Sequence, residues 1–329
     1  MESAADAINV RRPLGTDETV LFTVADKHLD GDGAVAVLLL EPSQGEAPAW
    51  EPGAHVDVVL APGLERQYSL CGGTDAGDPW RIGVLREPVS RGGSEFIHSS
   101  LAVGDMVSVR GPRNNFRLVD APAYTFIAGG IGVTPLIPMI REVERRGAPW
   151  TLTYGGRSAT SMAFIEELSA YGARVTLWPQ DEKGFIPLAD IVEGAPSASA
   201  VYCCGPEPLL NAIEDVMSTR GADRLHLERF RPRQDLLQQE RTAFEVYLDY
   251  SEMEVQVEAH ETIVEALERV GVEVITSCRE GTCGTCETVV LEGVPDHRDS
   301  YLSTEEKASN EVMMVCCSRA RTTRLVLDL

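Results

Sequence analysis

The sequence predicts a multidomain protein made of an antiparallel β-barrel, an α/β domain with a parallel sheet, and a small α+β domain. Three observations support this prediction. The chain has 329 residues, enough for two domains of about 150 residues or for three smaller ones. Its short β-rich runs change after Pro122 into alternating strands and helices, and return after residue 241. Five of its eight cysteines fall between Cys278 and Cys317, inside the last region.

Composition narrows the class of protein. Hydrophobic residues make up 43% and charged residues 24%, close to the globular averages of about 45% and 25%, which excludes a disordered chain. A net charge of −22 would repel DNA or RNA. Residues 1–13 are polar and unlike an export signal, and the most apolar window, 126–140, is interrupted by glycines and prolines. We therefore expect a cytoplasmic protein with no nucleic-acid and no membrane partner.

The barrel is expected over residues 1–121. Clusters of Gly, Pro and Asp separate β-rich runs, which predict strands over 20–24, 34–40, 55–60, 66–70, 80–85 and 106–109. Ser94 is expected to be the N-cap of one helix that runs to about Leu101.

The α/β domain is expected over residues 122–230, where strands and helices alternate as in a parallel sheet covered on both faces. We predict strands over 124–128, 151–154, 174–178 and 200–204, and helices after the glycines at 129–132 and over 162–171 and 208–219. Residues 231–241 are polar and predict a linker.

The last domain is expected over residues 242–329. We predict strands over 244–248, 254–257, 288–291, 312–315 and 325–327, around a helix over 262–270. This domain has 18 acidic and 7 basic residues, so it carries about half of the net charge.

The cysteine spacing predicts a metal centre. Cys278, Cys283 and Cys286 have the spacing C-x4-C-x2-C, and a further cysteine follows at Cys316. This is the plant-type arrangement for a [2Fe–2S] cluster held by four thiolates. Gly281 and Gly284 allow the tight loop that a cluster needs.

Other interpretations of the cysteines remain open at this stage. Structural zinc is disfavoured because a zinc ribbon usually has two C-x2-C pairs, and a thioredoxin-like pair would need a βαβ context. Cys316 and Cys317 are neighbours on an expected strand, so their side chains should point to opposite faces and one of them can be the ligand.

Two strand-to-helix turns predict a nucleotide site. The first strand of the α/β domain runs into a turn with Gly130, Gly132 and Thr134, where free amides can meet a pyrophosphate. The match to the dinucleotide fingerprint is imperfect, since Pro135 stands at the third glycine position. A second turn, Cys204-Gly205-Pro206, follows another apolar strand and should lie at the same sheet edge.

The barrel contains residues suited to a ring and a phosphate. Strand alternation places Arg66 and Tyr68 on one face, which offers a guanidinium and an aromatic plane. Downstream, Arg91-Gly92-Gly93-Ser94 opens a helix with amides, a hydroxyl and an arginine.

The order of these motifs resembles the phthalate dioxygenase reductase family: R-x-Y-S, G-G-S, G-G-I-G-x-T-P, C-G-P, and the cysteine cluster, over essentially the full chain. The resemblance implies a ferredoxin-reductase-like flavin barrel, an NAD domain and a β-grasp plant-type ferredoxin domain. It implies that FMN contacts Arg66, Tyr68, Ser69, Val84, Leu85, Gly92, Gly93 and Ser94. It also implies that the dinucleotide contacts Gly130, Gly132, Thr134, Cys204, Gly205 and Pro206.

The resemblance implies further roles. Phe230 resembles the aromatic that stacks on the flavin, Cys204 would lie by the nicotinamide, and Thr134, Cys204 and Phe230 become the candidate catalytic residues. The segment from Met314 is similar to the family's M-V-C-x-S-R, which makes Cys316 the preferred fourth iron ligand. No role is assigned to His98, His297 or Cys317.

The implied activity is transfer of a hydride from NADH to FMN, and of single electrons through [2Fe–2S] to a Rieske-type oxygenase or demethylase component. Acidic Asp181 and Glu182 favour NADH over NADPH, while Arg157 and Lys183 keep that choice open. The alternatives are a non-enzymatic iron–sulfur carrier or redox-responsive subunit, and a reductase for another acceptor such as a diiron hydroxylase.

Overall fold

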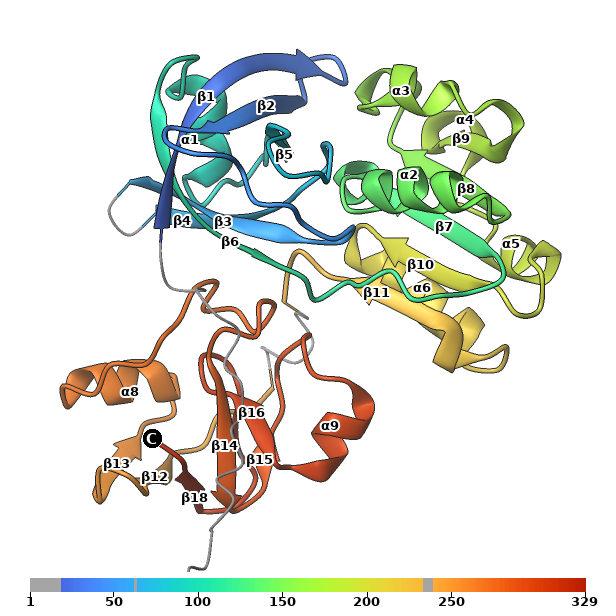
Figure 1. The fold of residues 1–329 in the computed structure, drawn as a ribbon. Helices are drawn as coiled ribbons and strands as arrows, with labels where there is room; N and C mark the ends of the chain where they lie inside the picture. The colour runs from blue at the N-terminus through green and yellow to red at the C-terminus, as the bar shows by residue number, and fades with distance from the viewer. Residues whose placement is uncertain (1–18, 62–63, 233–238) are drawn as a thin grey trace, which may run out of the picture.

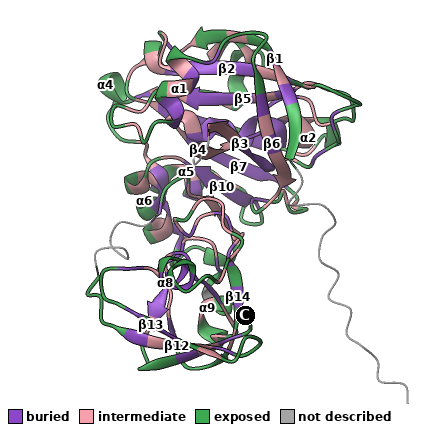
Figure 2. Cartoon of the chain, turned by 90° about the vertical axis from the view of Figure 1, so that its left-hand side faces the viewer, coloured by how far each residue is buried: buried purple, intermediate pink, exposed green. Residues whose placement is uncertain are grey.

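The computed structural model describes residues 19–61, 64–232 and 239–329, which form three main β-sheets (Figure 1). Part of the expected linker, residues 233–238, lies outside the described residues. Figure 2 shows that buried residues gather on the strands of the sheets and that exposed residues lie mainly on the outer helices and loops. Within the described chain, none of the helices combines the length and apolar character needed to cross a bilayer.

The first sheet is antiparallel, in the order β4-β3-β6-β1-β2-β5. It curls into a half-barrel. An isolated bridge between Leu70, which follows β4, and Ile82 of β5 joins the two edge strands at one point. Phe22 and Trp80 stack inside it with ring centroids 4.5 Å apart. The six expected strands are confirmed as β1 (Thr19–Asp30), β2 (Val35–Pro42), β3 (His55–Ala61), β4 (Leu64–Ser69), β5 (Trp80–Leu85) and β6 (Met106–Arg113).

The barrel helix, α1 (Gly93–Ser99), differs from the prediction at its start. The expectation of Ser94 as N-cap is wrong, because Gly92 is the N-cap with φ 93°, a backbone angle that favours glycine. Ser94 lies in the first turn, where its Oγ accepts a hydrogen bond from the Glu87 amide (3.2 Å) and donates one to Ser90 Oγ (3.0 Å).

The second sheet is wholly parallel, in the order β11-β10-β7-β8-β9, as the alternation of strands and helices predicts. Its strands are β7 (Tyr124–Gly129), β8 (Trp150–Gly156), β9 (Val175–Pro179), β10 (Ala200–Cys204) and β11 (Leu225–Glu228). Its helices are α2 (Leu136–Arg146), α3 (Ile165–Ser169), α4 (Gln180–Lys183), α5 (Leu188–Gly194) and α6 (Glu207–Met217). Short 3₁₀ turns lie at η1 (Gly130–Val133), η2 (Ala159–Ser161), η3 (Gly172–Arg174) and η4 (Ala222–Arg224). Strand β11 and helices α4 and α5 were not expected from the sequence.

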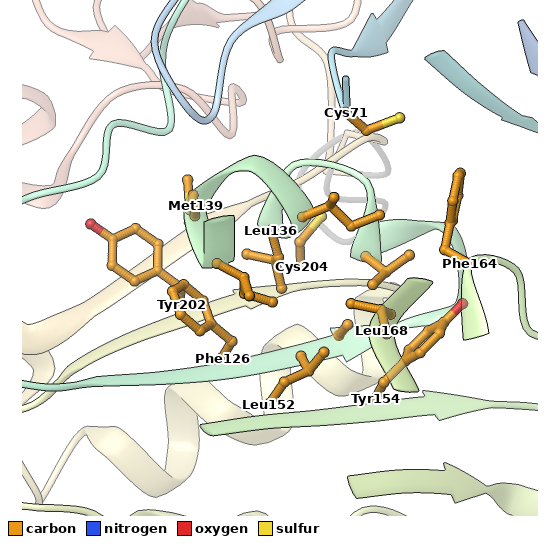
Figure 3. Close-up of a cluster of buried hydrophobic side chains, with 14 of the residues drawn as sticks. Cys71, Phe126, Leu136, Met139, Leu152, Tyr154, Phe164, Leu168, Tyr202 and Cys204 are labelled. Atoms are coloured by element: carbon orange, nitrogen blue, oxygen red, sulfur yellow. The ribbon is translucent and has the colours of Figure 1, made fainter. Parts of the chain in front are cut away.

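Strand alternation divides the core of this domain between the two faces of the sheet. Phe126 points into the cluster that contains Leu136 and Tyr202 (Figure 3), whereas its neighbour Ile127 joins Leu210 on the other face. The first cluster also includes Phe116 from the chain that leaves the half-barrel. The half-barrel and the α/β domain therefore share this cluster, whereas the interior of the half-barrel forms a separate one.

The third sheet is mixed, in the order β13-β12-β18-β14-β16, with β12 and β18 parallel and the other pairs antiparallel. Its elements are β12 (Phe244–Leu248), β13 (Met253–Val257), α8 (Ile263–Arg269), β14 (Glu287–Glu292), α9 (Thr304–Ser309), β16 (Val312–Met314) and β18 (Arg324–Leu327). A small ribbon pairs β15 (Pro295–Asp296) with β17 (Arg319–Ala320). The expected strands and helix α8 are confirmed, and α9 was not expected.

One expectation about the third domain is wrong. Cys316 and Cys317 were expected on a strand, but β16 ends at Met314 and the two cysteines lie in a turn. The amides of Cys317 and Ser318 both donate to the Met314 carbonyl, at 3.3 and 3.0 Å, which curls the chain out of the sheet. The sheet alternation argument therefore does not apply to this pair.

Candidate functional site

A cavity of about 640 Å³ lies where the half-barrel, the α/β domain and the third domain meet. Ten of the predicted site residues line it: Arg66, Tyr68, Ser69, Val84, Leu85, Gly93, Ser94, Thr134, Phe230 and Cys316. The other predicted residues are not part of the lining: Gly92, Gly130, Gly132, Cys204, Gly205, Pro206, Cys278, Cys283 and Cys286. Segments more than 200 residues apart in the chain thus converge on one space.

The barrel wall of the cavity is built by β4 and α1. Arg66 Nη2 donates to the Arg91 carbonyl (2.5 Å) and Nη1 to the Glu65 carbonyl (2.7 Å), which holds the guanidinium over the start of α1. A Cβ on Gly93 would lie 2.5 Å from Arg66 Cγ, so glycine is needed for this close approach. The arginine and the Ser90 and Ser94 hydroxyls form a pocket suited to a phosphate.

The same wall offers an aromatic ring and a strand edge. Burial raises the pKa of the Tyr68 phenol, which therefore stays neutral at physiological pH. His98, whose role the sequence did not indicate, contacts the carbonyl oxygen of Val84 through Nε2 at 2.9 Å. This contact ties α1 to β5 directly behind the cavity lining.

Glu228 is a site residue that sequence reasoning missed. Strand β11 places it beside Cys204 of β10, and it lines the cavity with Ser69. Burial raises the pKa of the Glu228 carboxyl to about 8, although the nearby Ser69 hydroxyl acts in the opposite direction. Glu228 Oε2 and Ser69 Oγ are both buried without a hydrogen bond of ordinary geometry. The sequence feature that could have identified Glu228 is its position directly before Arg229 and Phe230.

The two strand-to-helix turns pack against each other at the carboxyl ends of β7 and β10. A Cβ on Gly132 would lie 2.3 Å from the Cys204 carbonyl oxygen. Thr134 closes the first turn by donating from Oγ1 to the Ile131 carbonyl (2.9 Å), and it reaches the cavity. The Cys204 side chain is 0% exposed and belongs to the core in Figure 3, so it does not line the cavity.

The four predicted iron ligands lie together in the third domain. The Cys278 thiol is in hydrogen-bonding contact with those of Cys283 and Cys316, and Cys286 contacts Cys316. In this arrangement the thiols contact one another. Among the described residues, no three His, Cys, Asp or Glu side chains are arranged as ligands of a single metal ion.

The loop around these thiols suits a [2Fe–2S] cluster. Gly281 and Gly284 have φ of 73° and 75°, and a Cβ on Gly281 would collide with Cys317 Sγ at 2.4 Å. Backbone amides point at sulfur: Glu280 N and Thr282 N lie 3.3 and 3.5 Å from Cys278 Sγ. Such N–H groups stabilise thiolate ligands and tune their metal centre, so the three cysteines of this loop, together with Cys316, fit the group.

His55 was also missed. It lines the cavity on β3, opposite Ser69 of β4, and is 6% exposed with Nε2 lacking a hydrogen-bond partner. Burial, followed by the charge of Arg113, lowers its pKa to about 4. A neutral imidazole therefore lines the cavity between the barrel wall and the cysteine loop.

Comparison with known families matches two parts of the chain. The family described as "2Fe-2S iron-sulfur cluster binding domain" matches residues 246–321, and "Oxidoreductase NAD-binding domain" matches residues 126–215.

Curated relatives cover most of the chain. The chain is 43% identical over 307 residues to "Phenoxybenzoate dioxygenase subunit beta" of Ectopseudomonas oleovorans, covering 92% of this chain and 96% of the relative. It is 40% identical over 296 residues to "Tetrachlorobenzoquinone reductase" of Sphingobium chlorophenolicum, covering 86% and 89%.

Solved structures show the same architecture. An intact type IV self-sufficient cytochrome P450 monooxygenase is 37% identical with a TM-score of 0.86, covering 97% of this chain, while this chain spans 43% of that longer one. Phthalate dioxygenase reductase, a modular structure for electron transfer from pyridine nucleotides to [2Fe–2S], is 32% identical with a TM-score of 0.70, covering 95% and 98%. The chain therefore belongs to the phthalate dioxygenase reductase family of NADH-dependent iron–sulfur oxidoreductases.

Proposed function

We propose that this chain is the reductase component that supplies electrons from NADH, through FMN and a [2Fe–2S] cluster, to a Rieske-type oxygenase or demethylase. One observation carries the proposal: a single cavity is lined by the Arg66–Tyr68 strand, the Thr134 turn and Cys316. When bound, the flavin accepts the hydride of NADH and releases its two electrons singly to the cluster.

In this proposal the chain's own residues bind and orient the groups. Arg66, Ser94 and the glycines Gly92 and Gly93 hold the FMN phosphate, because they combine a guanidinium, a hydroxyl and a close backbone approach. Tyr68, Ser69, Val84 and Leu85 line the flavin ring. Phe230, which is 40% exposed at the rim of the cavity, covers the other face of the ring.

The dinucleotide lies along Gly130, Gly132 and Thr134, with Gly205 and Pro206 from the facing turn. Cys204 supports this edge from beneath, near the nicotinamide. NADH is favoured over NADPH because Asp181 and Glu182 lie on α4, where a 2′-phosphate would be repelled. Lys183 is engaged within the chain, since its Nζ donates to the Leu177 carbonyl (2.7 Å) and lies over the Trp178 ring.

Cys278, Cys283, Cys286 and Cys316 are the proposed cluster ligands. We place the flavin domain at 1–121, the NAD domain at 122–230, the linker at 231–241 and the ferredoxin domain at 242–329. The acidic ferredoxin domain supports a transient complex with an acceptor that carries a basic surface.

Anaerobic purification tests this proposal. Assays for FMN, iron and acid-labile sulfide should each find the group bound, and NADH should bleach first the flavin absorbance and then that of the cluster. A protein that binds the cluster but no flavin would instead be a simple carrier. Reduction of a diiron or quinone acceptor in preference to a Rieske protein would contradict the proposed partner.

A further inference from the structure

The half-barrel and the third domain meet at the loop that carries the clustered cysteines. Among the described residues, side-chain hydrogen bonds and ion pairs cross this boundary at three places. Ser277 Oγ donates to Glu65 Oε1 over 2.9 Å, Arg91 pairs with Glu280, and Asn115 Nδ2 donates to the Cys283 carbonyl over 3.1 Å. Of these three contacts, the hydrogen bond from Asn115 is the one accepted by a proposed iron ligand, Cys283.

The backbone on both sides of Asn115 is fixed to the half-barrel. Its predecessor Asn114 donates from Nδ2 to the Pro52 carbonyl (3.0 Å) and accepts from the Phe116 amide (3.0 Å). Phe116 is buried in the shared core, and Gly53 packs so closely that a Cβ there would lie 1.9 Å from the Phe116 carbonyl oxygen. Asn115 is therefore an exposed side chain on a backbone that is held at both sides, and it lines the cavity and contacts the cysteine loop.

We propose that Asn115 is a positioning residue for electron transfer from the flavin to the cluster. This inference rests on the proposed function. Its amide fixes the Cys283 backbone against the wall that holds the flavin, and so sets the separation of the two redox centres. NADH supplies an electron pair and the cluster accepts one electron at a time. One electron from the reduced flavin would reduce one Fe(III) of the cluster to Fe(II), and the acceptor protein would take that electron before the second one follows. Electron transfer slows as the two centres move apart, so loss of this hydrogen bond should slow cluster reduction to the extent that the loop leaves its position on the half-barrel.

Two variants of the holoprotein test the proposal. Asn115→Asp keeps the side-chain size but replaces the donor with a carboxylate, and Asn115→Ala removes the side chain. Asn211→Asp, at an exposed position on α6, is the matched control for the change in charge, because aspartate keeps the Oδ1 that accepts from Arg229 Nη2 at 3.4 Å. Stopped-flow absorbance separates reduction of the flavin by NADH from reduction of the cluster, and hydrogen–deuterium exchange reports on peptides that cover residues 278–286.

In both Asn115 variants we expect flavin reduction at the rate of the unmodified protein and cluster reduction slowed by about five-fold, the population shift that one lost hydrogen bond of ordinary strength allows. Peptides over 278–286 should exchange faster while those of the half-barrel core do not change, and Asn211→Asp should behave as the unmodified protein. This exchange readout does not depend on turnover.

The proposal is overturned if cluster reduction and exchange are unchanged in both variants. It is also overturned if both variants lose iron and sulfide, because Asn115 would then serve cluster assembly. Failure of the proposed function is distinguishable, because the unmodified protein would then lack FMN or the cluster, or would not be bleached by NADH.

Discussion

At the scale of single residues, we expect Glu228 to make the free energy of unfolding depend on pH. Its pKa is raised to about 8 by burial, so the folded state binds a proton that the unfolded chain releases above pH 4.5. The stabilisation from this proton is complete below pH 4.5 and is lost as pH rises through about 8.

Glu228→Gln should remove this dependence, because the amide keeps the shape of the protonated acid and does not titrate. Urea unfolding between pH 5 and pH 8.5 would measure it. We expect the stability of the unmodified protein to fall relative to the variant by about 1–3 kcal/mol over that range, less than the full shift because the residue keeps some solvent contact. Parallel stability curves for the two proteins would contradict the prediction.

The adjacent cysteines at 316 and 317 give a second prediction at this scale. Cys316 contacts Cys278 and Cys286, whereas Cys317 packs against Gly281. Cys316→Ser should therefore lose most of the bound iron and acid-labile sulfide, and Cys317→Ser should retain both. Electron paramagnetic resonance of the dithionite-reduced proteins would measure the cluster. An intact signal in Cys316→Ser, with loss in Cys317→Ser, would reverse the assignment.

At the scale of elements, the two turns proposed to bind the nucleotide pack against each other. Gly132→Ala would place a methyl group 2.3 Å from the Cys204 carbonyl oxygen and force the turns after β7 and β10 apart. Overpacking of this kind costs about 1–3 kcal/mol. Thermal unfolding should show a lower Tm, and titration should show weaker NADH binding.

Gly194→Ala is the control for this prediction. Gly194 closes α5 with nothing within 4 Å of an added Cβ and without a positive φ, so alanine should be neutral or slightly stabilising there. Equal effects of the two substitutions would contradict the packing argument.

At the scale of the whole molecule, charge is unevenly distributed. The chain carries −22 overall, and about half of this charge lies in the third domain. Opposite charges on an acceptor would speed encounter at low salt, by about ten-fold or more, and salt would screen that attraction. In the proposed function NADH reduces the flavin inside the cavity, and this step needs no acceptor protein.

Electron transfer to the oxygenase component should therefore slow as salt rises, while reduction of the flavin by NADH should not. Stopped-flow measurement of both steps across a salt series would test this. A rate of transfer that does not depend on salt would count against the charge argument.

The sequence by itself determined those features whose parts are adjacent in the chain. The C-x4-C-x2-C spacing predicts the cluster loop, the glycine turns after β7 and β10 predict the nucleotide edge, and period-two alternation predicts the strands of the half-barrel. Each depends on backbone geometry over a few residues, so the pattern is visible without the fold.

Only the tertiary structure decided which distant residues share the cavity. Glu228 reaches Ser69, Asn115 reaches Cys283, and His98 contacts Val84, and in each case the partners come from different elements. Helix α1 and the turn at Cys316 also depart from expectation because a positive φ at Gly92 and the hydrogen bonds to Met314 override the local pattern. Burial, which sets the pKa of Glu228 and leaves His55 neutral, is a property of the assembled core and has no signature in neighbouring residues.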